Sequence, residues 1–233
     1  DKLVINGDNE ITAGFAAQAR GEVVLFSRQR VLDRGICLRD GVIVSNNRPV
    51  LPAADIRLPG VHNLENYMTA LGLCQGLISP DAAKRVATSF RGVPHRLETV
   101  AVKRGVRFIN SSIDSSPTRT MAALSALEGR PIVICGGRDK HVPFDDLARA
   151  LNERAKAVVL TGEAAGLIGA ALAREGAAVP VCREPAFDDA VRLAASLAGE
   201  GDTVLLSPAC TSFDAFRNFE ERGDRFRKVV EEL

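Results

Sequence analysis

The chain has 233 residues, of which 46% are hydrophobic and 25% charged, and this composition argues against disordered and fibrous classes of protein. Thirty basic and 29 acidic residues leave a net charge of +1, without the basic excess that nucleic-acid binding usually needs, so no nucleic-acid partner is expected. The five cysteines form no CxxC pair and no apolar run is long enough to cross a bilayer, which predicts reduced thiols, a cytoplasmic location and no membrane contact.

The first ninety or so residues are predicted to combine a small β-meander with two helices. Short apolar runs bounded by glycine or polar turns predict strands, and Arg39-Asp40-Gly41 is typical of a hairpin corner. The strands are expected at residues 3–5, 23–27, 35–39 and 41–45, and the helices at 62–77 and from Pro80 to just before Phe90. The chain opens with Asp1 rather than Met and enters a strand at once, so we expect that a further segment precedes it.

Gly92-Val93-Pro94 interrupts the helical pattern, and we place a domain boundary there, between residues 1–92 and 93–233. Beyond it, strand and helix signals alternate, which predicts an α/β fold with a mainly parallel sheet covered by helices. The strands are expected at 106–110, 132–135, 157–160, 179–182 and 204–206, with helices beginning near 117, 144, 163 and 185. Ligands of such sheets bind at the carboxyl ends of the strands, where the unusual segments 111–116, 136–141 and 207–219 lie.

Two of the motifs combine a turn with cationic side chains. Gly136-Gly137-Arg138-Asp139-Lys140 follows a buried strand, where the glycines allow close backbone approach and the lysine supplies a positive charge. The alternative is an ordinary glycine turn with solvated charges. His95-Arg96 directly follows the domain boundary, and its guanidinium suits bidentate phosphate binding, although an isolated pair of this kind is more often a surface feature.

Three further segments carry polar side chains at the start of a helix. Gly60-Val61-His62-Asn63-Leu64-Glu65-Asn66 opens a helix, with His62 or Asn63 as the default cap and Asn63 and Asn66 on one face. Residues 110–120 hold many short hydroxyl side chains before Pro117, which also fits a cluster of helix caps. Residues 206–223 present backbone N–H groups and hydroxyls to an anion, whereas Phe213, Phe216 and Phe219 are otherwise expected in the core and Cys210 as a small buried apolar residue.

Taken together, these motifs resemble those of the Mur ligases, in particular the ligases that add D-glutamate to UDP-N-acetylmuramoyl-L-alanine. The resemblance covers nearly the whole chain, in the order helix start, hinge at 92–98, glycine loop and closing motif at 206–223. It implies a monomeric parent enzyme of cytoplasmic peptidoglycan precursor synthesis, an amide ligase that uses ATP to form an acyl phosphate. Residues 1–92 would be the end of its central ATPase domain, and residues 93–233 its Rossmann-like C-terminal domain.

The resemblance also implies a role for each candidate residue. Arg96 and Lys140 would be catalytic, since Arg96 would contact the transferring phosphate of ATP and Lys140 the α-carboxylate of D-glutamate. Asn66, near the adenine, and Ser111 would join Arg96 in binding ATP. The substrate would be bound by five residues, Phe219 through its backbone: Ser115, Lys140, Ser212, Phe213 and Phe219.

The chain departs from the family pattern in two respects. It contains no G-x-x-x-x-G-K-[ST] loop, so the groups that hold the ATP phosphates and Mg²⁺ are expected mainly upstream, no metal ligands are assigned here, and the chain alone is expected to be inactive. It also has Ser111 and Ile113 where the family commonly has aspartate and lysine, and Asp114 is expected to replace part of the lost charge. Two alternatives stay open: a ligand-binding module without catalysis, and a related Mur or folylpolyglutamate-type ligase.

Overall fold

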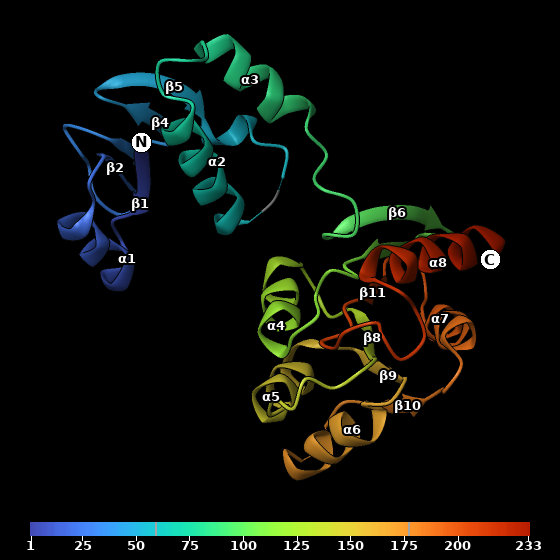
Figure 1. Ribbon diagram of the computed structural model, residues 1–233. Helices are drawn as coiled ribbons and strands as arrows, with labels where there is room; N and C mark the ends of the chain where they lie inside the picture. Colours follow the sequence, from blue (N-terminus) through green and yellow to red (C-terminus); the bar gives the residue numbers. More distant parts are fainter. Residues whose placement is uncertain (59, 177) are drawn as a thin grey trace. The chain divides into compact units, whose positions relative to one another are not determined.

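The computed structural model describes residues 1–58, 60–176 and 178–233. The chain divides into two compact units, Asp1–Arg91 and Gly92–Leu233, and each is described by itself (Figure 1). No helix in the described residues is both long and apolar enough to span a membrane.

The first unit contains a five-stranded mixed sheet in the order β1-β2-β3-β4-β5. Its strands are β1 (Lys2–Asn6), β2 (Glu22–Ser27), β3 (Ile36–Arg39), β4 (Val42–Ser45) and β5 (Arg48–Pro52). The expected meander is wrong in part, because β1, β2 and β3 pair in parallel and only β3-β4-β5 is antiparallel. The predicted hairpin corner is confirmed, with Asp40 and Gly41 at positive φ of 49° and 76°.

Two helices of the first unit pack on this sheet, α2 (Val61–Leu73) and α3 (Pro80–Ser89). They bury Met68, Leu71 and Ala87 against Phe26 and Ile43 of the strands. The helix expected to reach residue 77 ends at Leu73, because the chain then enters a turn in which Gly76 has a left-handed φ of 82°. The short helices α1 (Glu10–Gly14), η1 (Phe15–Gln18) and η2 (Ala53–Asp55) complete the unit.

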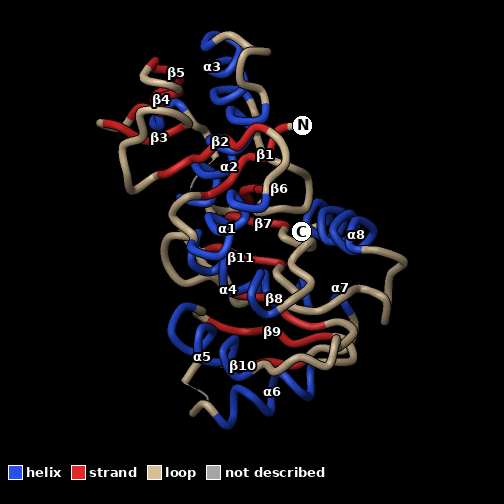
Figure 2. Tube along the Cα trace, turned by 60° about the vertical axis from the view of Figure 1, so that its left-hand side comes forward, coloured by secondary structure: helices blue, strands red, loops and turns tan. Residues whose placement is uncertain are grey.

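The second unit contains a six-stranded sheet in the order β10-β9-β8-β11-β7-β6 (Figure 2). Its strands are β6 (Glu98–Lys103), β7 (Val106–Asn110), β8 (Ile132–Gly136), β9 (Ala157–Thr161), β10 (Val181–Arg183) and β11 (Thr203–Leu206). All neighbouring strands pair in parallel except β6 and β7. The predicted α/β fold with a mainly parallel sheet is therefore confirmed.

Helices cover both faces of this second sheet, as Figure 1 shows. The helices are α4 (Pro117–Ala126), α5 (Asp145–Arg154), α6 (Ala165–Arg174), α7 (Phe187–Ser196) and α8 (Phe219–Glu232). One core cluster joins α4, α5 and α6 to side chains such as Val133 and Leu160, and the other joins α7 and α8 to Ile134 and Val159. Successive strand residues point to opposite faces, and helices cover both faces, so every residue of β8 and β9 is buried. Polar side chains can therefore lie only at the ends of these strands.

Candidate functional site

Three loops meet at the carboxyl edge of the second sheet, one after each of the neighbouring strands β7, β11 and β8. Residues 111–116 form the β7 loop, residues 137–144 the β8 loop and residues 207–218 the closing loop. The backbone of Arg138 exchanges two hydrogen bonds, of 2.9 and 3.1 Å, with Thr211 of the closing loop. The N–H of Ser111 donates to the carbonyl of Leu206 over 2.8 Å. Backbone hydrogen bonds thus join the β8 loop to the closing loop, and the β7 loop to the last residue of β11.

Two of the predicted substrate-binding residues touch at this edge. The ammonium of Lys140 donates a hydrogen bond of 3.3 Å to the hydroxyl of Ser115. Lys140 is exposed and Ser115 half-buried, so both groups remain accessible from solvent. The β7 and β8 loops therefore offer a cation beside a hydroxyl, the pair of groups that a carboxylate ligand needs.

The β7 loop also contains a buried carboxylate. Asp114 is 5% exposed and accepts a 2.9 Å hydrogen bond from the hydroxyl of Ser207. Burial raises the pKa of Asp114 above its usual range, and hydrogen bonds from Ser111 and Ser207 and the charges of Arg119 and Arg96 oppose the rise. Burial therefore disfavours a negative charge on Asp114, and its replacement of part of the charge lost at Ser111 and Ile113 stays a prediction.

The closing loop presents the other predicted substrate residues. Ser212 is buried, and its carbonyl accepts hydrogen bonds from the N–H groups of Ala215 and Phe216, of 3.1 and 2.8 Å. Phe219 begins α8, and its carbonyl accepts a 2.8 Å bond from the Ser112 hydroxyl. Phe213 is 57% exposed, so its alternative assignment to the core is wrong.

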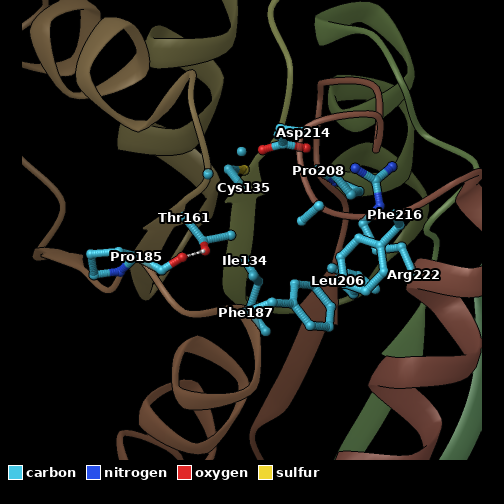
Figure 3. A pocket seen from close by; sticks show the side chains of 14 residues that line it. Ile134, Cys135, Thr161, Pro185, Phe187, Leu206, Pro208, Asp214, Phe216 and Arg222 are labelled. Atoms are coloured by element: carbon cyan, nitrogen blue, oxygen red, sulfur yellow. Dashed lines mark hydrogen bonds between the residues drawn. The ribbon is translucent and has the colours of Figure 1, made fainter.

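A cleft opens between the closing loop and the ends of β8 and β9 (Figure 3). Its empty space amounts to about 370 Å³, which includes open solvent. The rings of Phe187 and Phe216 meet edge to face on its wall, with centroids 5.0 Å apart. Asp214 and Arg222 contribute opposite charges to the same lining. The cleft thus lies next to the closing loop, which contains Ser212 and leads into Phe219 at the start of α8.

Arg222 is a residue whose place the sequence patterns did not reveal. It stands in a charged helix, yet it is 2% exposed and donates hydrogen bonds to the carbonyls of Ser112 and Cys210, of 2.8 and 3.2 Å. Burial lowers the pKa of Arg222 to about 10, which Asp214 opposes, so the guanidinium stays charged at neutral pH. A signal did exist: Phe226, Val229 and Val230 follow at helical spacing, so Arg222 lies on the apolar face of α8.

The hinge segment is attached to the β7 loop just before Arg96. His95 is buried and its ring nitrogen Nδ1 lies 3.0 Å from the side-chain amide of Asn110. The N–H of Leu97 donates to the hydroxyl of Ser111 over 3.2 Å. The two residues of this unit that were predicted to bind ATP, Arg96 and Ser111, therefore lie near each other, and Arg96 is exposed.

Asn66, the remaining predicted ATP contact, belongs to the first unit and lies exposed on α2. Its side chain donates a 3.4 Å hydrogen bond to Asn63, as expected for two residues on one helix face. The expected cap by His62 or Asn63 is wrong: both lie inside the helix, Gly60 holds the N-cap position, and its φ of 99° suits glycine.

The described residues show no group of three or more His, Cys, Asp or Glu side chains that could hold a metal ion. The cations at the site are instead suited to anions: Lys140 and Arg96 are exposed, and both lie beside loops with serine hydroxyls. The residues present therefore fit carboxylate or phosphate groups, and a magnesium ion would need further ligands.

The second unit belongs to the class of doubly wound α/β domains, with polar loops at the carboxyl edge of its parallel strands. The family model described as "Mur ligase, glutamate ligase domain" matches residues 95–210. With the relatives below, this match shows that the chain belongs to the Mur ligase family.

Individual relatives agree with this family. The chain is 42% identical over 243 residues to the UDP-N-acetylmuramoylalanine–D-glutamate ligase of Acetivibrio thermocellus, aligning 100% of the chain with 52% of that protein. The same-named protein of Symbiobacterium thermophilum is 44% identical over 244 residues, with coverage of 100% and 53%. Among solved structures, UDP-N-acetylmuramate-alanine ligase MurC of Thermotoga maritima matches with a TM-score of 0.71 at 17% identity, covering 100% of this chain and 52% of that one. The chain thus spans about half the length of the relatives it matches.

Proposed function

We propose that this chain is part of an ATP-dependent ligase that joins D-glutamate to UDP-N-acetylmuramoyl-L-alanine in cytoplasmic peptidoglycan precursor synthesis. The observation that carries the proposal is the contact between Lys140 and Ser115, at the sheet edge where the closing loop with Ser212 leads into Phe219 of α8. The names of the relatives above favour D-glutamate over the amino acids of other Mur-type ligases. We also propose that the parent protein is a monomer without nucleic-acid or membrane partners.

In this proposal the second unit binds the incoming amino acid. The ammonium of Lys140 and the hydroxyl of Ser115 would hold the α-carboxylate of D-glutamate, and Ser212 with the backbone at Phe219 would hold the side-chain carboxylate. Phe213 is exposed beside Ser212 and would cover the ligand. Two carboxylates fixed at separate loops would orient the amine, which is the main contribution that a binding site makes to a reaction of two bound substrates.

ATP would supply the phosphoryl group that activates the substrate carboxylate as an acyl phosphate. The amine of D-glutamate then attacks the acyl carbon, an amide bond forms, phosphate leaves and the amine loses a proton. Arg96 would stabilise the negative charge on the transferring phosphoryl group, beside Ser111, and Asn66 would contact the adenine. The phosphates of ATP and the magnesium ion would be held mainly by the half of such ligases that this chain does not span.

Substitution of Lys140 tests the proposal directly. Lys140→Ala in the intact ligase is expected to raise the KM for D-glutamate about tenfold or more, or to abolish turnover, because a charged hydrogen bond to the carboxylate is lost. Steady-state kinetics with each substrate varied in turn provides the measurement. Lys103→Ala is the control, since Lys103 lies on β6 and its ammonium donates to the carbonyl of Glu231 near the end of α8, away from the Lys140 loop. Unchanged kinetics in Lys140→Ala would sink the assignment.

A second measurement distinguishes the proposal from the two alternatives, a related ligase and a ligand-binding module without catalysis. A titration of the chain with D-glutamate, L-glutamate and L-alanine, followed by amide NMR shifts, should show a preference for D-glutamate at Lys140 and Ser212. A preference for L-alanine or L-glutamate would favour a related ligase. Binding of D-glutamate together with an inactive parent protein would favour a non-catalytic module.

A further inference from the structure

A single buried guanidinium joins the three loops of the candidate site. Arg222 donates through Nε to the hydroxyl of Ser112, over 3.0 Å, and through its terminal nitrogens to the carbonyls of Ser112 and Cys210. These partners belong to the β7 loop and the closing loop. The Ser112 hydroxyl in turn donates to the carbonyl of Phe219 over 2.8 Å, so Arg222 also acts on the first residue of its own helix.

The β8 loop meets the same group at a glycine. A Cβ atom on Gly137 would lie 3.1 Å from a terminal nitrogen of Arg222 and 2.2 Å from the carbonyl oxygen of Thr211. Gly137 also has a φ of 132°, which other residues rarely adopt. The backbone of the β8 loop therefore packs directly against the guanidinium, three residues before Lys140.

Hydrogen-bond geometry and charge distinguish Arg222 from its neighbours on the helix. Arg225 and Arg227 form ion pairs with Asp188 and Glu98. Arg222 forms no ion pair with a carboxylate of the described residues, and its N–H groups donate instead to loop carbonyls and a hydroxyl. Burying a charge without a paired carboxylate is costly. A planar group with five donors is, however, well suited to hold several loop atoms at set distances.

We propose that Arg222 is a positioning residue for the amino-acid substrate. It holds the β7, β8 and closing loops together, and thereby sets the distance between the groups that bind the α-carboxylate of D-glutamate and those that bind its side-chain carboxylate. This inference rests on the proposed function. Arg222 itself touches no substrate in this assignment. It acts through Ser112 on Phe219, through Cys210 on the segment before Ser212, and through the packing of Gly137 on the loop of Lys140.

The test is a titration of the 233-residue chain with D-glutamate and with L-glutamate, followed by the amide NMR shifts of Lys140 and Ser212. Arg222→Lys keeps the positive charge but loses the fork of donors, so D-glutamate binding should weaken about tenfold and the preference for the D-isomer should fall toward one. A merely structural role would lower the unfolding temperature without changing this preference. Arg225→Lys on the same helix is the matched control, and its D-glutamate affinity and isomer preference should equal those of the unsubstituted chain.

A second variant protects the test against a folding defect. Ser112→Ala removes the hydroxyl between Arg222 and Phe219 while leaving the bonds to both loop carbonyls, so a smaller weakening of D-glutamate binding is expected. If Arg222→Lys folds and binds both isomers as before, or if it fails to fold and Ser112→Ala binds unchanged, the inference is overturned. If the unsubstituted chain shows no response to D-glutamate, the proposed function itself fails, and this inference with it.

Discussion

The two sheets of this chain differ in how their strands are covered, and the difference explains where side chains for chemistry can lie. In the second unit, β8, β9 and β11 are buried along their whole length between two layers of helices. In the first unit, β1 has one exposed residue, Leu3, β5 has three, and the sheet is contacted mainly by α2 and α3. A sheet covered on both faces leaves only its strand ends for polar groups, and the candidate site lies at those ends.

The largest contrast between the units is expected at two glycines. Gly136→Ala would place a Cβ 1.7 Å from the carbonyl oxygen of Thr161 at a φ of 134°, so destabilisation of about 3 kcal/mol or more is expected. Gly41→Ala, with a φ of 76° and open space around it, should cost about 1 kcal/mol. Hydrogen exchange read peptide by peptide gives each unit its own opening free energy. Equal costs at the two positions would contradict the close packing of the β8 end.

A smaller contrast is expected between side chains of the two sheets. Ile134→Ala empties a fully buried position in β8 and should cost the second unit about 2–5 kcal/mol. Leu3→Ala in β1, where the leucine is 38% exposed, should cost about 1 kcal/mol or less. The same peptide-resolved exchange measurement applies, and the unit that does not carry the substitution serves as the internal control. A loss at Leu3 as large as that at Ile134 would show that the first sheet is covered more fully than described.

The smallest effect concerns pH. Because burial raises the pKa of Asp114, its protonated form favours the folded state, and this stability is present below the unfolded pKa of about 3.8 and lost as the pH rises through the folded value. Asp114→Asn should therefore show a smaller loss of stability than the parent chain as the pH rises from about 4. Unfolding temperatures of both proteins between pH 4 and 7 give the comparison. Asp189→Asn, at an exposed position on α7, is the control. Parallel curves for Asp114→Asn and the parent would contradict the assignment.

Much of the second unit could be predicted from the sequence, because its buried parallel strands read as short apolar runs between helical patterns. The approach of Lys140 to Ser115 also followed from the rule that the carboxyl ends of parallel strands share one edge. The edge strands β5 and β6 were not predicted, since β5 contains Pro49 and Pro52 and β6 is only half-buried. The parallel pairing of β2 with β3 was missed for another reason: an apolar run shows that a strand exists, not which strand it pairs with.

The buried position of Arg222 was harder to predict. In a helix where Glu220, Glu221, Asp224 and Arg225 surround it, a charged side chain is expected to face solvent. Only its spacing to the apolar residues further along α8 indicates burial. Its partners are main-chain carbonyls of loops more than ten residues away, and no sequence pattern reports such contacts.

The place of β11 has a consequence for how the protein is made. This last strand lies between β7 and β8, so the strands that leave the ribosome earlier, β7 with β6 on one side and β8 with β9 and β10 on the other, have no hydrogen bonds across the gap until residues 203–206 emerge. The nascent chain therefore carries two half-sheets with open edges while the residues between β8 and β11 are being made. Lys140 and Ser115 follow strands of opposite halves, so β11 must be made before the sheet can hold them together.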